Sequence, residues 1–518
     1  MPENIIYPIG VQSFEKLRRE NCLYVDKTPY IWELVNQVYP VFLSRPRRFG
    51  KSLLMSTVEA YFLGKKDLFE GLAIYSLEQK WRQYPVFHFD FNSAGSQSAT
   101  QLKKVIDRYL TLYENIWGIT PKPDDLEENR FANLIYKASR DSGLGCVLLF
   151  DEYDKPLLNT FEDLTLQQSY QDVLKPFYGI IKTMDAHIRF TMITGVARFG
   201  KVSIFSDLNN LEDISLNPRF NAICGVSESE LSKYFAQSIS EYSHTKGIPE
   251  SLTRELLRRN YDGYHFCNPA DAEGIYNPLS LLKAFYNGDI ADYWFDTGTP
   301  THLVKHLIDS NFHFNEMDEI YLTRSELLNA NVLAANDDVT LFQSGYLTIR
   351  EYDPTDELYR LGFPNEEVER AFDSLSLETY GAASSSPFDV AKFRKELATG
   401  KADKVMQRIQ SLFCDFPNDQ IRDLELHYHN VVYLLFKLLG YFCHTEKKTS
   451  HGRIDLLVET SRYIYLFEFK LDQTAEKAMR QIRDKQYDLP FRTDGRKVIR
   501  IGVNFSSRTK SVESWLID

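Results

Sequence analysis

An apolar run that enters a Gly-Lys-Ser turn is the feature that most restricts what this chain can fold into. Val41–Ser44 leads into the residues RPRRFGKS, and a helical pattern follows. Where a strand, a tight turn and a helix N-terminus meet, backbone N–H groups and the helix dipole bind phosphates. A lysine then reaches the β- and γ-phosphate oxygens, and a hydroxyl holds Mg²⁺. Gly50, Lys51 and Ser52 supply these groups, although Arg45 stands where the usual P-loop motif begins with glycine. Alone the motif is weak evidence, since a turn before a helix cap can look the same.

A second motif lies roughly 100 residues further along the chain. Four apolar residues, Val147–Phe150, end in the two carboxylates Asp151 and Glu152. A buried central strand can deliver an aspartate beside Mg²⁺, while the next glutamate orients the attacking water. An acidic pair at the end of a strand is most often only a solvated strand end. In this order and spacing, however, the two motifs predict a site for ATP and Mg²⁺.

The next expected strand, Ile188–Thr194, ends in a polar residue that could sense the γ-phosphate. Four residues later, Arg198 could reach a nucleotide in the same chain or across an interface, which leaves a homo-oligomer open. The alternative for Arg198 is a surface or structural arginine.

The pattern along the chain predicts an α/β multidomain protein with three parts, residues 1–225, 226–400 and 401–518. In the first part β-rich runs alternate with helical stretches, which predicts a parallel sheet flanked by helices. The middle part is mainly helical: Ser227 with Glu230 predicts a capping box that opens a helix through Ser240, and a hairpin is expected near Val339–Ile349. The other expected elements are the strands Val86–Phe91, Arg453–Glu459, Tyr463–Leu471 and Lys497–Asn504, the helices Ser52–Phe62, Ala99–Trp117, Leu166–Met184, Ser251–Asn260, Pro278–Asn287, Thr301–Ser310 and Thr474–Lys485, and a loop at Ala382–Pro387.

Three charged residues interrupt two apolar strands near the C-terminus. Asp455 lies in the first of them, and Glu468 and Lys470 lie in the second. Residues i and i+2 of a strand project from one face, so Glu468 and Lys470 are expected to point together, with Asp455 on the neighbouring strand. Buried charges are costly unless they are paired or bind metal. A divalent cation held by Asp455 and Glu468 would satisfy them, while Lys470 could orient a water and offset phosphate charge. The alternative is a buried Glu–Lys pair with Asp455 capping a turn.

Two acidic residues upstream could complete this site. Glu446 precedes the first of the two strands and is slightly favoured over Glu425, which begins a helical stretch; either could be a solvated surface charge. His427 and His429 alternate with aromatic residues on the same helical stretch. Such histidines are more often core or capping residues than ligands, so no zinc site is predicted.

Several segments together resemble one known family. They are YVDKT at Tyr24–Thr28, the RPRRFGKS segment, FDEYD at Phe150–Asp154, ITGV at Ile193–Val196, HGRID at His451–Asp455 and FEFK at Phe467–Lys470. Over nearly its whole length the chain resembles the bacterial AAA-ATPase-like proteins, in which an AAA+-related domain is joined to a PD-(D/E)XK nuclease-like domain.

The resemblance implies a P-loop sheet with a helical lid, a middle helical region and a C-terminal α/β domain of the restriction-endonuclease type. It makes Arg45 at the first P-loop position a family trait. It also implies that Gln481 and Tyr487 lie near the catalytic centre, as ligands of DNA or of the water, although other roles are as common for such residues.

Composition restricts the remaining choices. The net charge of −12 does not suggest a protein that coats nucleic acid, but an acidic metal site can still lie in a locally basic groove. The six cysteines form no CxxC pair, so free thiols are expected. The N-terminus lacks the pattern of a signal peptide, and the apolar run Val431–Phe442 is too short to span a bilayer, which predicts a cytoplasmic protein that does not enter a membrane.

Two hypotheses follow. The first is an ATP-controlled nuclease that uses Mg²⁺ or Mn²⁺ to cleave nucleic acid, DNA more readily than RNA; by analogy alone, such a fusion suggests a role in phage defence. The second is a nucleotide-dependent signalling or scaffold protein whose C-terminal domain binds nucleic acid or a partner without cutting. The intact Asp455, Glu468 and Lys470 favour the first hypothesis, because a relic would be expected to lose one of them.

Overall fold

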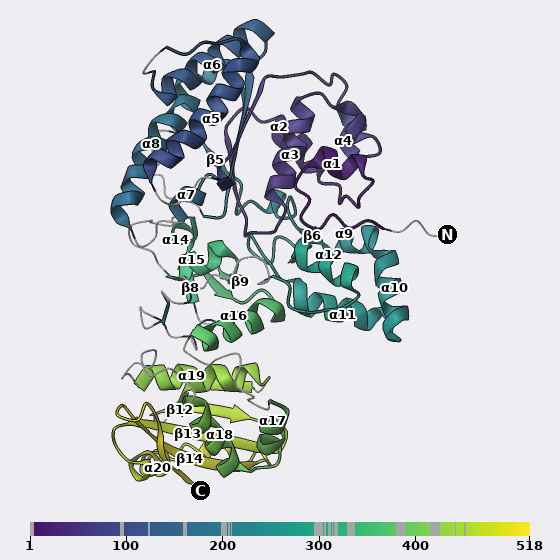
Figure 1. The fold of residues 1–518 in the computed structure, drawn as a ribbon. Helices are drawn as coiled ribbons and strands as arrows, with labels where there is room; N and C mark the ends of the chain where they lie inside the picture. Colours follow the sequence, from purple (N-terminus) through teal and green to yellow (C-terminus); the bar gives the residue numbers. More distant parts are fainter. Residues whose placement is uncertain are drawn as a thin grey trace. The chain divides into compact units, whose positions relative to one another are not determined.

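The computed structural model of the 518-residue chain describes residues 5–93, 98–122, 125–158, 163–197, 205, 208, 210–294, 304, 307–308, 312, 314, 317, 320–328, 337–379, 390–414, 425–440, 442–449 and 452–518. The chain divides into two compact units (Figure 1). Unit 1 comprises residues 1–294 and 319–367, and unit 2 comprises residues 295–318 and 368–518.

A parallel sheet of five strands organises unit 1. Its strands are β1 (Val41–Ser44), β2 (Val86–Asp90), β3 (Cys146–Asp151), β4 (Ile188–Gly195) and β5 (Glu212–Asp213), in the order β2-β3-β4-β1-β5. This confirms the predicted sheet. Because the carboxyl ends of parallel strands meet at one edge, the residues after β1, β3 and β4 gather there. β4 lies between β1 and β3, so its tip stands between the Gly-Lys-Ser turn and the acidic pair.

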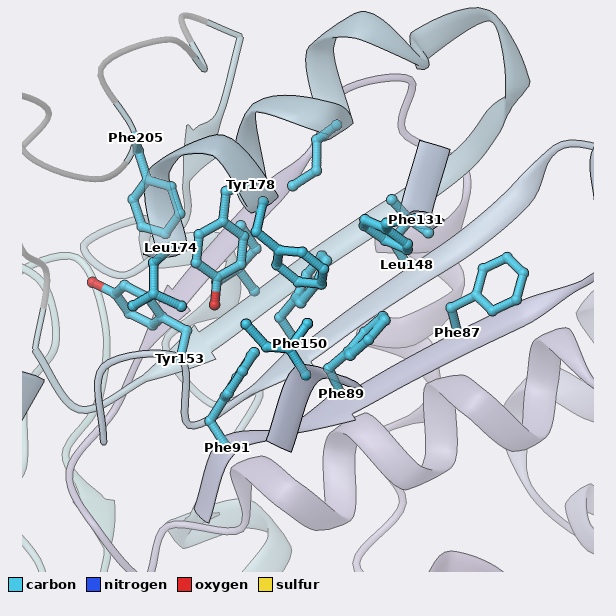
Figure 2. Packing of buried hydrophobic residues seen from close by; sticks show 14 of the residues in the cluster. Phe87, Phe89, Phe91, Phe131, Leu148, Phe150, Tyr153, Leu174, Tyr178 and Phe205 are labelled. Atoms are coloured by element: carbon cyan, nitrogen blue, oxygen red, sulfur yellow. The ribbon is translucent and has the colours of Figure 1, made fainter. Parts of the chain in front are cut away.

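Helices cover both faces of this sheet. Figure 1 shows α1 (Phe14–Arg19), α2 (Thr28–Val35), α3 (Lys51–Phe62) and α4 (Ala73–Leu77) on one side, and α5 (Ala99–Trp117), α6 (Glu127–Ser142) and α8 (Leu164–Thr183) on the other. The second side is rich in buried aromatic rings, among them Phe89, Phe131, Phe150 and Tyr178 (Figure 2). Apolar residues at helical spacing on α5, such as Leu102, Ile106 and Leu110, complete this core.

The helical part of unit 1 begins with the predicted capping box. The Ser227 hydroxyl accepts the backbone N–H of Glu230, and the Glu230 carboxylate accepts the backbone N–H of Ser227. The single helix expected through Ser240 is wrong, however: the structure has α9 (Glu228–Tyr234) and α10 (Ala236–Lys246), separated at Phe235. Phe235 is buried, stacks on Phe285 and has a non-helical backbone (φ −118°).

The hairpin predicted near Val339–Ile349 is also misplaced. That stretch forms α15 (Asp337–Ser344), whose first turn is acidic as the helix dipole favours. The hairpin follows it, with β9 (Thr348–Asp353) antiparallel to β10 (Leu358–Gly362). Alternation of apolar residues over a short run did not distinguish a buried helix from a strand here.

A mixed five-stranded sheet organises the C-terminal part of unit 2. Its strands are β11 (Phe442–Thr449), β12 (Gly452–Glu459), β13 (Tyr463–Leu471), β14 (Lys497–Ser506) and β15 (Ser511–Ile517), in chain order. Only the β13–β14 pair is parallel among these neighbours. The helices α18 (Ala402–Cys414), α19 (Glu425–Leu438) and α20 (Ala475–Asp484) contact this sheet.

Helix α20 lies unusually close to β14 at Gly502. A Cβ atom at this glycine would lie 2.6 Å from the backbone nitrogen of Met479 and 2.7 Å from the carbonyl oxygen of Ala475. Helix and strand are therefore in direct backbone contact, which a residue with a side chain would prevent.

The other helices and strands complete the two units. They are α7 (Lys155–Leu158), β6 (Val226–Ser227), α11 (Glu250–Tyr261), β7 (Ile275–Tyr276), α12 (Pro278–Asn287), β8 (Ile320–Thr323), α14 (Arg324–Leu328), α16 (Glu366–Thr379) and α17 (Val390–Ala398). The expected loop at Ala382–Pro387 and most of the helix expected at Thr301–Ser310 lie outside the described residues. The six cysteines all lie in the described ranges and form no disulfide bond. Within the described ranges, no helix has the length and apolar character that crossing a membrane requires.

Candidate functional site

The Gly-Lys-Ser turn joins β1 to α3 as the sequence predicts. Gly50 adopts a left-handed conformation (φ 93°) directly before α3, with open space where a Cβ would lie. Lys51 is buried, and its ammonium donates hydrogen bonds to the carbonyl oxygens of Arg45 (2.8 Å) and Pro46 (3.0 Å). Ser52 is half-buried in the first turn of α3. The lysine is thus folded over the loop whose N–H groups would surround a phosphate.

The acidic pair lies at the same edge of the sheet. The Asp151 carboxylate accepts the hydroxyl of Thr194 (2.5 Å) and the backbone N–H of Glu152 (3.0 Å). Glu152 is half-buried and has a left-handed backbone (φ 50°), so it turns away from the line of β3. Burial lowers the pKa of Lys51, while the carboxylates of Asp151, Glu152 and Asp154 oppose that effect. The structure therefore brings Lys51, Asp151, Glu152 and Thr194 together.

Asp154 connects the ends of β3 and β4, a contact that the sequence did not reveal. Its carboxylate accepts the backbone N–H groups of Val196 (2.8 Å) and Ala197 (2.6 Å), and burial raises its pKa to about 6. The segment after β3 is thereby tied to the segment after β4. Arg198, the predicted nucleotide-contacting arginine, lies just beyond this point and outside the described residues.

Arg45 has a structural role in place of the first P-loop glycine. The residue is 1% exposed, and its guanidinium donates to the carbonyl oxygens of Ser215 (2.8 Å) and Phe220 (2.9 Å) and lies 4.0 Å from the centre of the Phe266 ring. The arginine therefore fastens the loop to a segment about 170 residues away in the chain. Burial lowers its pKa to about 10.

An apolar cavity of about 100 Å³ lies beside the turn. Phe49, Gly50 and Leu53 line one side of it. The other walls come from the N-terminal segment and from the helical part of unit 1, including Tyr24, Val25, Cys224, Val226, Phe235 and Leu282. Lys27 also lines it, and its ammonium pairs with Glu230 (2.6 Å).

In unit 2, the three charged residues of the two apolar strands lie together. Lys470 donates to a carboxylate oxygen of Glu468 at 2.7 Å, which confirms that the two side chains share a face. The Asp455 carboxylate accepts the backbone N–H of Phe469 (2.7 Å), so Asp455 reaches across to β13. Glu468 is fully buried. Burial lowers the pKa of Lys470, but Glu468, with smaller contributions from Asp455 and Glu425, outweighs it and leaves the pKa above its usual value.

Helix α19 adds two more ligand-type side chains to this site. The Nε2 atom of His429 lies 3.8 Å from a carboxylate oxygen of Glu425 and 3.9 Å from one of Asp455. Sequence reasoning judged His429 a core or capping residue. The available signal was its spacing from Glu425, since residues i and i+4 share a helix face.

Three further residues were expected near this site: Gln481, Tyr487 and Glu446. Tyr487 is buried; burial raises its pKa, a hydrogen bond with Gln481 opposes this, and the charges of Glu468 and Asp455 add to it. Gln481 and Tyr487 thus lie near the acidic residues. Glu446 precedes β12 as expected and lies within the additional strand β11; the position of its side chain is outside the described part.

Comparison with known proteins gives two family matches. Residues 8–205 match the family described as "Predicted AAA-ATPase", and residues 423–515 match the family described as "PD-(D/E)XK nuclease superfamily". A relative from Azotobacter chroococcum mcd 1, "Uncharacterized protein in vnfD 5'region", is 35% identical over 525 residues, which cover 99% of this chain and 98% of the relative. The crystal structure of Cdc6p from Pyrobaculum aerophilum is 12% identical, covering 73% of this chain and 97% of that one; its TM-score of 0.23 is too low to support an inference.

Proposed function

The chain belongs to the family of predicted AAA-ATPases that are joined to a PD-(D/E)XK nuclease superfamily domain, and on this premise we propose that it binds and hydrolyses ATP to control a metal-dependent nuclease. The N-terminal unit supplies the ATPase, and the C-terminal sheet supplies the phosphodiester cleavage. The three-part division at residues 225 and 400 stays part of this proposal.

The loop at Gly50 and the first turn of α3 would hold the ATP phosphates. Lys51 would exchange the carbonyl oxygens of Arg45 and Pro46 for phosphate oxygens, which its position over the loop supports. Ser52 and Asp151 would hold Mg²⁺, whose charge offsets that of the phosphates. The apolar cavity next to Gly50 suits an adenine ring, because its walls are mostly aliphatic and aromatic.

Glu152 would orient the attacking water, and Thr194 would report the state of the γ-phosphate. Thr194 donates to Asp151, so a change at the metal-binding carboxylate is passed directly to the tip of β4. Asp154 extends this connection to Val196 and Ala197. This chain of contacts gives a physical route from nucleotide state to the segment that contains Arg198, which would contact nucleotide in the same chain or in a second copy.

Asp455 and Glu468 would hold a divalent ion, which polarises the scissile phosphate and lowers the pKa of a bound water. Lys470 would place its positive charge beside the phosphate and the water. Gln481 and Tyr487 would contact nucleic acid or that water, and Glu425 is favoured over Glu446 as the third carboxylate because its charge acts on Lys470. DNA is proposed as the substrate.

One observation carries the nuclease proposal. Glu468 is fully buried and accepts a hydrogen bond from Lys470 at 2.7 Å, and Asp455 of β12 reaches the same part of β13 through the backbone N–H of Phe469. Burying charged groups costs several kcal/mol each unless they are paired or bind metal. A structural ion pair would explain Glu468 and Lys470, but it would not explain Asp455 beside them.

The test is a cleavage assay with the full chain on mixed DNA and RNA substrates, with Mg²⁺ or Mn²⁺, with and without ATP. Wild-type protein should cleave in a nucleotide-dependent way, and Asp455→Ala should not cleave. Glu476→Gln, which changes an exposed carboxylate of α20, is the matched control and should cleave normally. If wild type cuts nothing under any of these conditions yet binds nucleic acid, the scaffold function replaces the nuclease. If Asp455→Ala cuts as well as wild type, the active site lies elsewhere.

A further inference from the structure

Within the part of the chain that the structure describes, one group of three side chains has ligand atoms close enough to hold a single metal ion. It consists of Glu425 and His429 of α19 and Asp455 of β12, and all three ligand atoms lie within 4.8 Å of one another. The side chains of His429 and Asp455 are 15% and 14% exposed, so the group is sheltered but open to an incoming ion.

The distances between these atoms fit shared coordination better than direct hydrogen bonding. Hydrogen bonds between such groups measure about 2.7–3.2 Å. The His429 nitrogen lies 3.8 and 3.9 Å from its two carboxylate neighbours. For metal–ligand distances of about 2.1 Å, neighbouring ligand atoms lie about 3–4 Å apart. Small side-chain movements would therefore bring all three atoms around one ion.

The group is also not an ordinary helix pair. Glu425 and His429 are one helical turn apart, and many such pairs are merely exposed neighbours. Asp455 comes from a different element, and its carboxylate lies as close to the imidazole as that of Glu425. The Asp455 carboxylate also accepts the backbone N–H of Phe469 at 2.7 Å, so the group lies beside the Glu468–Lys470 pair.

We propose that His429 is a ligand of the divalent ion in this domain, together with Asp455 and Glu425, and that this nitrogen ligand makes the site prefer Mn²⁺ over Mg²⁺. This rests on the proposed nuclease function and adds to it the identity of the ion. Mg²⁺ demands oxygen ligands in strict octahedral geometry, whereas first-row transition metals accept imidazole readily.

The experiment measures metal binding and not cleavage. Mn²⁺ is titrated into the full chain without nucleotide, so that the phosphate-dependent ion of the N-terminal unit is not bound, and free Mn²⁺ is followed by electron paramagnetic resonance. Pulsed measurements on the bound ion detect a coordinated imidazole nitrogen directly. Mg²⁺ affinity is obtained by competition. His429→Gln is the test variant because glutamine keeps a polar atom near the position of Nε2. His444→Gln on β11 is the matched control, a half-buried histidine of the same sheet.

Wild type should show a nitrogen signal that disappears in His429→Gln, together with a loss of Mn²⁺ affinity of about tenfold or more and a smaller change for Mg²⁺. His444→Gln should behave as wild type, and Asp455→Ala should lose the signal as well, which assigns it to this domain. An unchanged nitrogen signal or unchanged Mn²⁺ affinity in a folded His429→Gln protein would overturn the proposal, as would wild type without nitrogen coordination. Nitrogen-coordinated Mn²⁺ in a protein that cuts nothing would refute the nuclease function and leave the ligand assignment standing.

Discussion

Replacing Arg45 with glycine restores the usual P-loop motif, and the structure predicts that this restoration destabilises the protein. The substitution removes the guanidinium hydrogen bonds to the carbonyl oxygens of Ser215 and Phe220 and the contact with the Phe266 ring. Each of these hydrogen bonds from a charged donor is worth about 2 kcal/mol, and the ring contact is worth about 1 kcal/mol.

Part of this loss is recovered because a buried charge disappears. Burial lowers the pKa of Arg45 to about 10, which corresponds to about 3 kcal/mol of cost for the charged form. Glycine destabilises the folded state by about a further 1 kcal/mol, because it gives the unfolded chain more backbone freedom to lose on folding. Arg45→Gly should therefore lower the stability of unit 1 by about 3 kcal/mol.

Differential scanning calorimetry of the nucleotide-free full chain measures this effect. The transition of unit 1, which has about 340 residues, should move down by about 4 °C. Arg47→Gly is the matched control: it changes an exposed arginine of the same loop and should shift the transition by only about 1 °C. An Arg45→Gly protein that melts with the wild type would show that the guanidinium does not fasten the loop. Tighter ATP binding at unchanged stability would show instead that Arg45 is a defect in the motif.

Four further predictions concern single side chains. Lys51→Ala should weaken ATP binding by at least about 100-fold in a titration, since no other side chain of the Gly-Lys-Ser turn carries positive charge; near-normal affinity in folded protein would remove the P-loop assignment. Glu152→Gln should bind ATP normally but turn it over at least about 100-fold more slowly in a phosphate-release assay, and normal turnover would exclude Glu152 as the water-orienting group. Lys470→Ala should abolish cleavage while metal binding, measured by titration, persists, because the lysine contributes charge and not a ligand; loss of both would make it a structural residue. Burial raises the pKa of Glu367 from 4.5 to about 7, so the folded state binds more protons than the unfolded state between these values and stability falls by about 3 kcal/mol as pH rises through that window. Glu367→Gln should therefore raise the melting midpoint at pH 8 more than at pH 4.5, and an equal shift at both would contradict the assigned pKa.

The elements that hold the N-terminal site were predictable because their signals are local. Val41–Ser44 and Val147–Phe150 are apolar runs that end in a turn or a charge, and their order along the chain implies a parallel sheet. The carboxyl ends of parallel strands lie at the same edge of a sheet, regardless of how the other elements are arranged. Lys51, Asp151 and Thr194 could therefore be expected at one edge.

What the sequence did not reveal depends on contacts between distant residues. The partners of Arg45 lie about 170 residues away, so its role could not be distinguished from that of a degenerate P-loop residue. His429 was assigned to the core because its pairing with Asp455 depends on how α19 packs on the sheet. The strand β11 was not recognised, because its polar C-terminal half, with Lys447 and Lys448, lacks the apolar pattern of a buried strand.

The backbone contact at Gly502 has a consequence for how this molecule tolerates mutation. Where a helix rests on a sheet through side chains, a changed core residue lets the helix move by a few tenths of an ångström as the packing relaxes. Here the separation of α20 and β14 is fixed by main-chain atoms, so substitutions of Ile464 or Ile482 in the surrounding core can change stability without changing the height of the helix above the strands. The main-chain contact therefore fixes how far Gln481 of α20, and Tyr487 shortly after it, stand from the strand next to Glu468.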